Sequence, residues 1–266
     1  MELPVNHFKR KALAAAARSG PIPLGTWVMS ASAIVAEAMG CAGFDWLVVD
    51  AEHSPLDSMD VAAMLAAIGT TGASPVVRIP ANDPVLVKRA MDAGAQTLMF
   101  PMIQTAADAE RAVVSTRYPP LGIRGAAAMH RASRFGCVPD YLKRAGEQTC
   151  VVVQIESVAA IRNLESIVAV DGVDCIFVGP GDLSASMGLA GELGHPDVHE
   201  QLQRAAQISA RAGKPCGIVM GQPDAVNQCM EYGYTYVAIA SDLGMLMARA
   251  AEMLGKLRPL AALKKA

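Results

Sequence analysis

The feature that most constrains the fold is an alternation, repeated eight times, between short apolar runs and longer alanine-rich segments. The short runs are rich in β-branched residues and are apolar at successive positions, which is typical of strands that are covered on both faces. Strands of that kind, separated by helices, indicate a parallel sheet enclosed by helices. Eight strand–helix units of about 30 residues each fill nearly all of the 266 residues, and this is the size of a (β/α)8 barrel.

The boundaries of these elements follow from turn and cap residues, such as the Asp83-Pro84 pair at a helix start. The predicted strands are 24–28, 45–49, 75–79, 96–100, 150–155, 175–178, 215–219 and 234–239. The predicted helices are 33–41, 58–71, 84–93, 106–117, 158–170, 196–212, 223–232 and 243–257. One long irregular stretch, from Tyr118 to about Gln148, is a candidate functional loop.

A doubly wound open sheet is the rival fold. It would normally place a Gly-x-Gly-x-x-Gly turn after its first strand, where this chain has Met29-Ser30-Ala31-Ser32. We therefore predict a single α/β domain over residues 1–266, a (β/α)8 TIM barrel. An N-terminal lead-in helix with Asn6 as its N-cap precedes the barrel.

Composition excludes several classes of protein. With 23 basic and 25 acidic residues, the net charge of −2 does not suit a nucleic-acid binder, and no apolar run is long enough to span a membrane. The six cysteines form no Cys-x-x-Cys pair and show no zinc spacing, which favours free thiols in a reducing compartment. The sequence thus predicts a compact globular enzyme, with the cytoplasm as its location.

Chemistry in a (β/α)8 barrel lies at the carboxyl ends of the strands. Gln154 and Glu156 end the fifth predicted strand and, being two apart, share its inner face. Asp182 follows the neighbouring strand within Gly179-Pro180-Gly181-Asp182. Two carboxylates there suit Mg²⁺ or Mn²⁺, with water and substrate at the other positions, although each could instead cap a helix. Backbone N–H groups of the glycine-rich turn could hold a small carboxylate.

Charged groups end two further strands. Arg78 lies in an otherwise apolar run and can clamp a carboxylate or an enolate oxygen, or form an ion pair with Asp50 or Glu52. His53 follows Asp50 and could form an Asp–His unit that acts as a base, or simply begin a loop. No lysine follows a predicted strand, which disfavours a Schiff-base mechanism.

With these residues in place, the chain resembles the metal-dependent (class II) pyruvate aldolases of the 4-hydroxy-2-oxo-heptane-1,7-dioate aldolase and 2-dehydro-3-deoxy-glucarate aldolase family. The resemblance covers about residues 20–258, with the motifs in family order. They are Phe44-Asp45-Trp46, Asp50-Ala51-Glu52-His53, Val77-Arg78-Ile79-Pro80, Asp92-Ala93-Gly94-Ala95, Pro119-Pro120-Leu121-Gly122-Ile123-Arg124-Gly125, Gln154-Ile155-Glu156-Ser157 and Gly179-Pro180-Gly181-Asp182-Leu183-Ser184.

The resemblance implies an aldehyde-lyase that reversibly cleaves 4-hydroxy-2-oxo acids to pyruvate (or hydroxypyruvate) and an aldehyde through an enolate. It implies Glu156 and Asp182 as ligands of a divalent metal, Mg²⁺ or Mn²⁺ and possibly Co²⁺. His53 would be the catalytic base, acting with Asp50, and Arg78 would steady the enolate. Small-molecule 2-oxo acids and aldehydes would be its partners, with neither nucleic acid nor membrane.

The same resemblance assigns further residues. Asp92 would tune the histidine, perhaps across a subunit boundary, while Gln154 and the backbone N–H of Gly181 would hold the 2-oxo acid. Ala126 and Val219 match positions that shape the aldehyde side. The family implies a homohexamer, a trimer of dimers that exchange the last helix.

Two other functions remain open from the residues. One is a related barrel lyase acting on a CoA thioester or phosphoenolpyruvate, for which Arg124, His130, Arg131 and Arg134 offer positive charge. The other is a non-catalytic binding protein for 2-oxo acids. The pairing of Asp50 with His53 disfavours pure binding, because binding needs no base.

Overall fold

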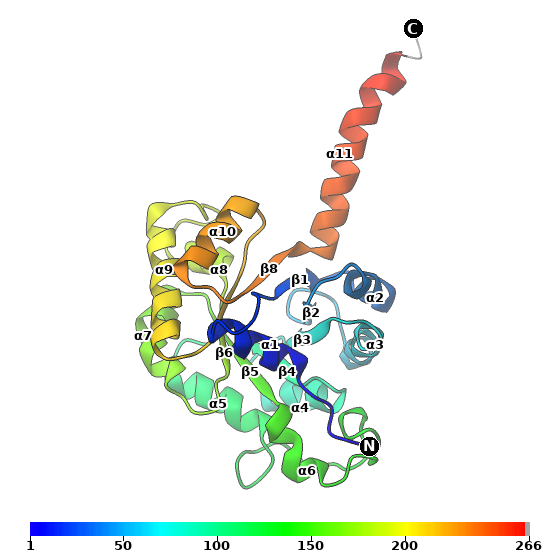
Figure 1. Cartoon of the computed structure of the whole chain (residues 1–266), viewed down its shortest axis with the longest axis vertical. Helices are drawn as coiled ribbons and strands as arrows, with labels where there is room; N and C mark the ends of the chain where they lie inside the picture. The colour runs from blue at the N-terminus through cyan, green and yellow to red at the C-terminus, as the bar shows by residue number, and fades with distance from the viewer. Residues whose placement is uncertain (264–266) are drawn as a thin grey trace.

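A computed structural model describes residues 1–263 and contains a closed barrel of eight parallel strands in sequence order, enclosed by helices (Figure 1). The predicted (β/α)8 fold is confirmed. The single domain predicted over 1–266 includes residues 264–266, which lie outside the described residues. The strands are β1 (Leu24–Val28), β2 (Trp46–Asp50), β3 (Ser74–Arg78), β4 (Thr97–Phe100), β5 (Cys150–Ile155), β6 (Cys175–Val178), β7 (Cys216–Val219) and β8 (Tyr236–Ser241).

Helices follow the strands in the expected alternation. They are α1 (His7–Ala16), α2 (Ala33–Cys41), α3 (Ser58–Ile68), α4 (Pro84–Asp92), α5 (Ala106–Thr116), α6 (Tyr141–Arg144), α7 (Val158–Val168), α8 (Pro180–Ser186), α9 (Pro196–Arg211), α10 (Pro223–Tyr232) and α11 (Asp242–Leu263), with 3-10 turns η1 (Arg131–Ser133) and η2 (Ala145–Gln148). Most predicted boundaries hold within one to three residues.

Three expectations about the elements are corrected. The last strand begins at Tyr236 rather than at residue 234, because Tyr234 is buried outside the barrel with its hydroxyl donating to the carbonyl of Leu202. Helix α11 continues past residue 257 to Leu263, and Pro259 is accommodated within it. The sequence predicts no helix between residues 178 and 196, but residues 180–186 form α8, with Pro180 in its first turn, where the missing N–H costs no hydrogen bond.

Aromatic rings fill the amino-terminal half of the barrel interior. The Phe8 ring, on α1, contacts Trp46 and Tyr236 with ring centroids 5.4 and 5.5 Å apart. Two strand glycines make room, because a Cβ on Gly25 or Gly217 would lie within 2.3 Å of the Trp46 or the Tyr236 ring. The predicted lead-in helix is confirmed, and it closes this end of the barrel. The barrel interior is therefore closed at this end and opens only at the carboxyl ends of the strands.

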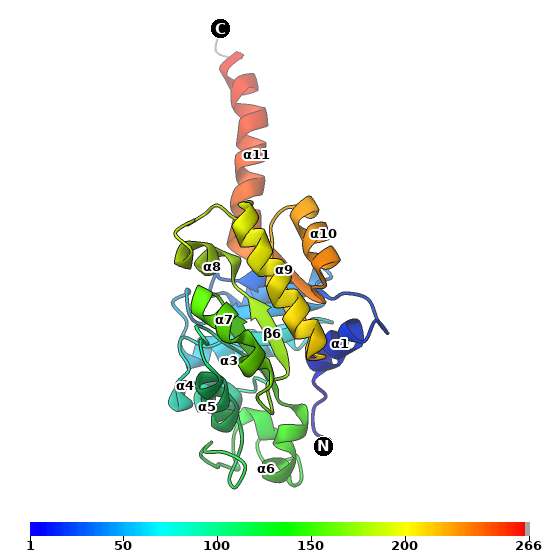
Figure 2. The same ribbon diagram turned by 90° about the vertical axis from the view of Figure 1, so that its left-hand side faces the viewer.

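Helix α11 does not pack along the barrel wall but projects away from it, as both views show (Figures 1 and 2). Its apolar side chains are exposed, including Leu246 at 63% and Met247 at 66%. Within residues 1–263, no helix has the length and apolarity to cross a membrane.

Candidate active site

Polar side chains replace the aromatic lining at the carboxyl ends of β2, β3 and β5. Trp46, Val48 and Asp50 alternate along β2, with the first two in the barrel interior, so Asp50 continues the inward face. Asp50 stands in register with Arg78, the last residue of β3. Gln154 on β5 and Glu156 just beyond it share a face by the same period. The barrel interior is therefore apolar in its amino-terminal half and ionisable at the carboxyl ends of the strands, which form the mouth of the barrel.

Arg78 is held by two carboxylates and an indole ring. Its Nε and Nη2 donate to the two oxygens of Asp50 at 2.8 and 2.7 Å, and its Nη1 lies 3.0 Å from Oε2 of Glu52. Its guanidinium carbon lies 4.2 Å from the centroid of the Trp27 ring. Such a bidentate, stacked arrangement fixes the plane of the guanidinium. Donors of Nη1 and Nη2 remain for a substrate oxygen.

Glu156 is a buried carboxylate with no cationic side chain within ion-pair distance among the described residues. The backbone N–H of Met102 donates to its Oε1, and Nε2 of Gln154 donates to its Oε2, both at 2.7 Å. Burial raises the pKa of Glu156 to about 7, and the negative charges of Asp182 and Glu52 add to the effect. A group of this kind is stabilised by a cation that arrives with the substrate.

Gly179 lets the Glu156 side chain occupy this position. A Cβ at Gly179 would lie 2.6 Å from Oε2 of Glu156 and 3.3 Å from Nε2 of Gln154. The side-chain oxygen Oε1 of Gln154 is buried and has no hydrogen-bond partner among residues 1–263. An unsatisfied buried acceptor costs about 1–3 kcal/mol, so a donor from a bound molecule is favoured there.

Asp182 lies in the first turn of α8, exposed at the mouth, and its charge raises the pKa values of both Glu52 and Glu156. For Glu52, burial is the larger cause of the increase. No group of three or more His, Cys, Asp or Glu side chains within residues 1–263 has metal-site geometry. Glu156 and Asp182 are two carboxylates whose charges interact at the mouth, and oxygen ligands of this kind are those that hard divalent cations such as Mg²⁺ or Mn²⁺ prefer.

The His53 imidazole stands apart from Asp50, with which the sequence pairs it. Asp50 is occupied by Arg78 and by the backbone N–H groups of Glu52 and His53. The imidazole is 61% exposed, and its Nε2 lies 3.9 Å from Oε2 of Glu52. Asp50 therefore orients Arg78 and the backbone that carries His53, rather than the imidazole itself.

Asp92 and Ala126 lie at the opposite end of the barrel from this site. Asp92 is the last residue of α4, which returns the chain to the amino-terminal end of β4. Its carboxylate accepts a 2.6 Å hydrogen bond from Nη2 of the fully buried Arg124, and Ala126 follows in the same loop. Val219, by contrast, ends β7 and borders the mouth. Within one chain, Asp92 does not reach His53.

The ion pair of Arg78 with Asp50 or Glu52, which the sequence leaves open as an alternative, is present with both carboxylates. Trp27 is the site residue that the sequence does not identify, although its ring contacts the Arg78 guanidinium. A strand tryptophan usually belongs to the core, so no local signal sets Trp27 apart.

The described lysines lie away from the mouth. They are on α1, α4, α6 and α11, or precede β7, where Nζ of Lys214 donates to the carbonyl of Val173. None of them is placed to form a Schiff base with a substrate at this site.

The fold and this polar mouth define a (β/α)8-barrel enzyme. Residues 24–249 match the family described as HpcH/HpaI aldolase/citrate lyase. This chain belongs to that family. It is similar to a 2-dehydro-3,6-dideoxy-6-sulfogluconate aldolase from Pseudomonas putida, at 49% identity over 89% of this chain and 92% of the relative. It is also similar to a 5-keto-4-deoxy-D-glucarate aldolase from Salmonella arizonae, at 44% identity over 85% and 89%. The chain is thus an enzyme, a carbon–carbon lyase.

Solved structures of similar proteins have the same fold as this chain. A HpcH/HpaI aldolase/citrate lyase family protein from Burkholderia cenocepacia superposes with a TM-score of 0.90 at 43% identity, covering 96% of this chain and all of that one. A HpcH/HpaI aldolase from Desulfitobacterium hafniense superposes with a TM-score of 0.85 at 27% identity, covering 94% of this chain and 96% of that one.

Proposed function

We propose that this enzyme is a divalent-metal-dependent aldolase that cleaves 4-hydroxy-2-oxo acids to pyruvate, or hydroxypyruvate, and an aldehyde. The observation that carries the proposal is the buried Gln154–Glu156 pair, which faces Asp182 and lacks a cation of its own. Glu156 and Asp182 would hold a divalent cation, which would supply Lewis-acid chemistry to the bound 2-oxo acid. Members of the family to which the chain belongs are expected to share this requirement.

Arg78 stabilises the charge that develops during the reaction. When the C3–C4 bond breaks, its electron pair becomes the C2–C3 double bond of an enolate, and negative charge builds on the 2-oxo oxygen. The guanidinium is already fixed by Asp50 and Glu52, so it needs no reorganisation when that charge appears. Gln154 and the backbone N–H of Gly181 orient the 2-oxo acid beside it.

His53 handles the protons. It takes the proton of the 4-hydroxyl as C4 becomes the aldehyde carbon, and a proton is returned to C3 to give pyruvate. Because Asp92 of the same chain lies at the other end of the barrel, we propose that Asp92 of a neighbouring subunit orients this imidazole. Ala126 of that subunit would then face the aldehyde side, opposite Val219.

Helix α11 supports assembly into an oligomer. It projects from the barrel with apolar side chains exposed, and an isolated helix with such a surface is stabilised only by packing against another chain. We propose that α11 packs on a second copy and that dimers associate into a trimer of dimers. Sedimentation should then give a mass near six times 27.8 kDa.

The two named relatives indicate the substrate class. Cleavage of a 5-keto-4-deoxy-glucarate gives an aldehyde that bears a carboxylate, and cleavage of the sulfogluconate derivative gives one that bears a sulfonate. We propose that this enzyme likewise releases a short hydroxy-aldehyde with an anionic end. A CoA substrate is not favoured, since Arg124 is buried against Asp92 and lies away from the mouth of its own barrel.

The test measures pyruvate release from 4-hydroxy-2-oxo acids that differ only in the tail, anionic or neutral, with Mg²⁺, Mn²⁺ or Co²⁺ and with EDTA. Metal-dependent release that favours the anionic tail is expected. Glu156→Gln should abolish it, whereas Glu165→Gln, an exposed site on α7, should leave it unchanged. Release that persists in EDTA would contradict the proposed metal dependence.

A further inference from the structure

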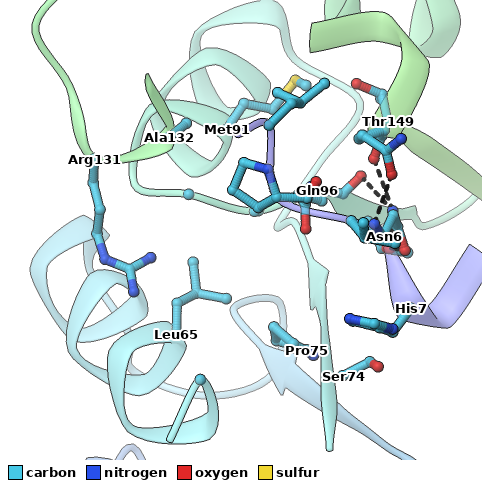
Figure 3. A pocket seen from close by; sticks show the side chains of 18 of the residues that line it. Asn6, His7, Leu65, Ser74, Pro75, Met91, Gln96, Arg131, Ala132 and Thr149 are labelled. Carbon is cyan, nitrogen blue, oxygen red and sulfur yellow. Dashed lines mark hydrogen bonds between the residues drawn. The ribbon is translucent and has the colours of Figure 1, made fainter. Parts of the chain in front are cut away.

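A cavity of about 580 Å³ lies at the amino-terminal end of the barrel, opposite the candidate active site (Figure 3). Its wall includes Ser74 at the start of β3, Gln96 just before β4 and Thr149 just before β5. The remaining lining comes from the N-terminal segment, from the ends of α3 and α4 with the loops that follow them, and from residues 131–149. A volume of this size accommodates a small organic ligand.

The N-terminal segment forms a fixed wall of the cavity. Buried Asn6 donates through Nδ2 to Oγ1 of Thr97 at 3.0 Å and to the carbonyl of Gln148 at 2.9 Å, and its backbone N–H donates to the side chain of Gln148. Nε2 of Gln96 donates to the carbonyl of Pro4. Figure 3 shows this network beside the cavity. The wall is thus preorganised, which lowers the cost of binding.

The cavity has basic residues in its lining and no acidic ones. Lys11, Arg131 and Arg134 line it together with His7, and no aspartate or glutamate does. Lys11 already pairs with Asp45 at 2.8 Å. Arg131 and Arg134 form no ion pair with a carboxylate in the part of the chain that the structure describes. Burial lowers the pKa of Arg131 and the charge of Arg134 lowers it further, with no acidic group to offset either effect.

Gly94 leaves the space that the Arg131 guanidinium occupies. Gly94 has a φ of +111°, and a Cβ there would lie 2.4 Å from Nη1 of Arg131. Nη1 donates to the carbonyl of Ala93, just after α4, at 3.0 Å, and within residues 1–263 the other guanidinium donors make no hydrogen bond. In Figure 3 the Arg131 side chain points into the cavity toward Leu65. An arginine held in this way offers planar recognition of an oxyanion.

We propose that this cavity binds a small anion, with its carboxylate or phosphate group against Arg131 and Arg134. The apolar wall of Leu65 and Met91 accepts the less polar part of an organic anion. The cavity lies at the end of the barrel opposite Arg78 and Glu156 of the same chain, so an anion bound there does not occupy that chain's own active site. Its binding does not depend on which reaction the mouth catalyses.

Hydrogen–deuterium exchange with mass spectrometry tests the proposal on the full chain, with inorganic phosphate and succinate as separate probes. We expect slower exchange in peptides covering residues 3–11 and 131–149, with half-saturation shifted at least five-fold in Arg131→Gln and in Arg134→Gln. The Arg134 side chain makes no hydrogen bond within residues 1–263, so its loss leaves the fold intact. Arg211→Gln, on α9, is the matched control and should match the wild type.

Protection by phosphate alone or by succinate alone supports the site and identifies the group that it prefers. Protection that is absent with both probes, or that is unchanged in both arginine variants, would overturn the proposal. Protection confined to residues 150–156 and 175–184 would also overturn it, since the anion would then bind at the mouth. Aldolase activity is not used as a readout, so failure here does not bear on the proposed reaction.

Discussion

Gly179→Ala adds a single methyl group and tests whether the site depends on the position of the Glu156 side chain. The new Cβ would lie 2.6 Å from Oε2 of Glu156, well inside any normal contact, and 3.0 Å from the Cβ of Glu156. The backbone at Gly179 has a φ of −94°, which alanine adopts without strain. The substitution therefore acts through the Glu156 side chain, which must move away from its position beside Gln154.

The size of the effect follows from the contacts that Glu156 would lose. Its hydrogen bonds from Met102 and Gln154 involve a charged group, and each such bond contributes about 1.5–3 kcal/mol. Losing one of them would weaken metal affinity, and kcat/KM with it, by a factor of about 10 to 150. Overpacking adds a stability cost of about 1–3 kcal/mol.

The assay combines calorimetric titration of Mn²⁺ with initial rates of pyruvate release. Gly194→Ala serves as the control, because a Cβ at Gly194 meets nothing within 4 Å. The control should match the wild type in both measurements. If Gly179→Ala bound Mn²⁺ and turned over within two-fold of the wild type, the assignment of Glu156 as a ligand in this position would be refuted.

Three further predictions concern the pH dependence, the guanidinium and the subunit boundary. The pKa of Glu156 is raised from 4.5 to about 7, so its contribution to the stability of the metal-free protein falls as pH rises from about 4.5 to 7. Cation binding should therefore release close to one proton at pH 6 and almost none at pH 8. Calorimetry in buffers of different ionisation enthalpy measures this release. Equal proton release at both pH values would contradict the raised pKa. Arg78→Lys keeps the charge but loses the bidentate bond to Asp50, and kcat/KM should fall about 100-fold (~3 kcal/mol) in the pyruvate-release assay. A loss under three-fold would contradict the proposal that the fixed guanidinium plane stabilises the enolate. His53→Ala and Asp92→Asn should each be nearly inactive. Co-expressed as mixed oligomers, they should recover part of the wild-type activity, because some active sites then combine an intact His53 from one chain with an intact Asp92 from another. No recovery in verified mixed oligomers would refute an active site shared between two subunits.

Local sequence signals predicted most of the fold. Proline at the first turn of α4 and glycine after it set that helix to within one residue, and Gly94 has the positive φ expected of a helix end. The sequence prediction missed α8, a helix of seven residues that begins at Pro180 and buries Leu183 in the core.

The site could be predicted in part. The period of two placed Gln154 with Glu156 on one face of the strand. For Asp50 the sequence left two partners open, Arg78 and His53. Strand spacing carries no information on which side chain competes better, and only the structure shows that Arg78 and backbone N–H groups occupy Asp50 and exclude the imidazole of His53.

Deuterium exchange into the methyl group of pyruvate, followed by proton NMR, tests the central claim most directly, because it reports enolate formation without an aldehyde. The account predicts exchange with Mg²⁺ or Mn²⁺ that stops in EDTA and is lost in Glu156→Ala. Exchange that continues unchanged in EDTA, or that survives in Glu156→Ala, would contradict it.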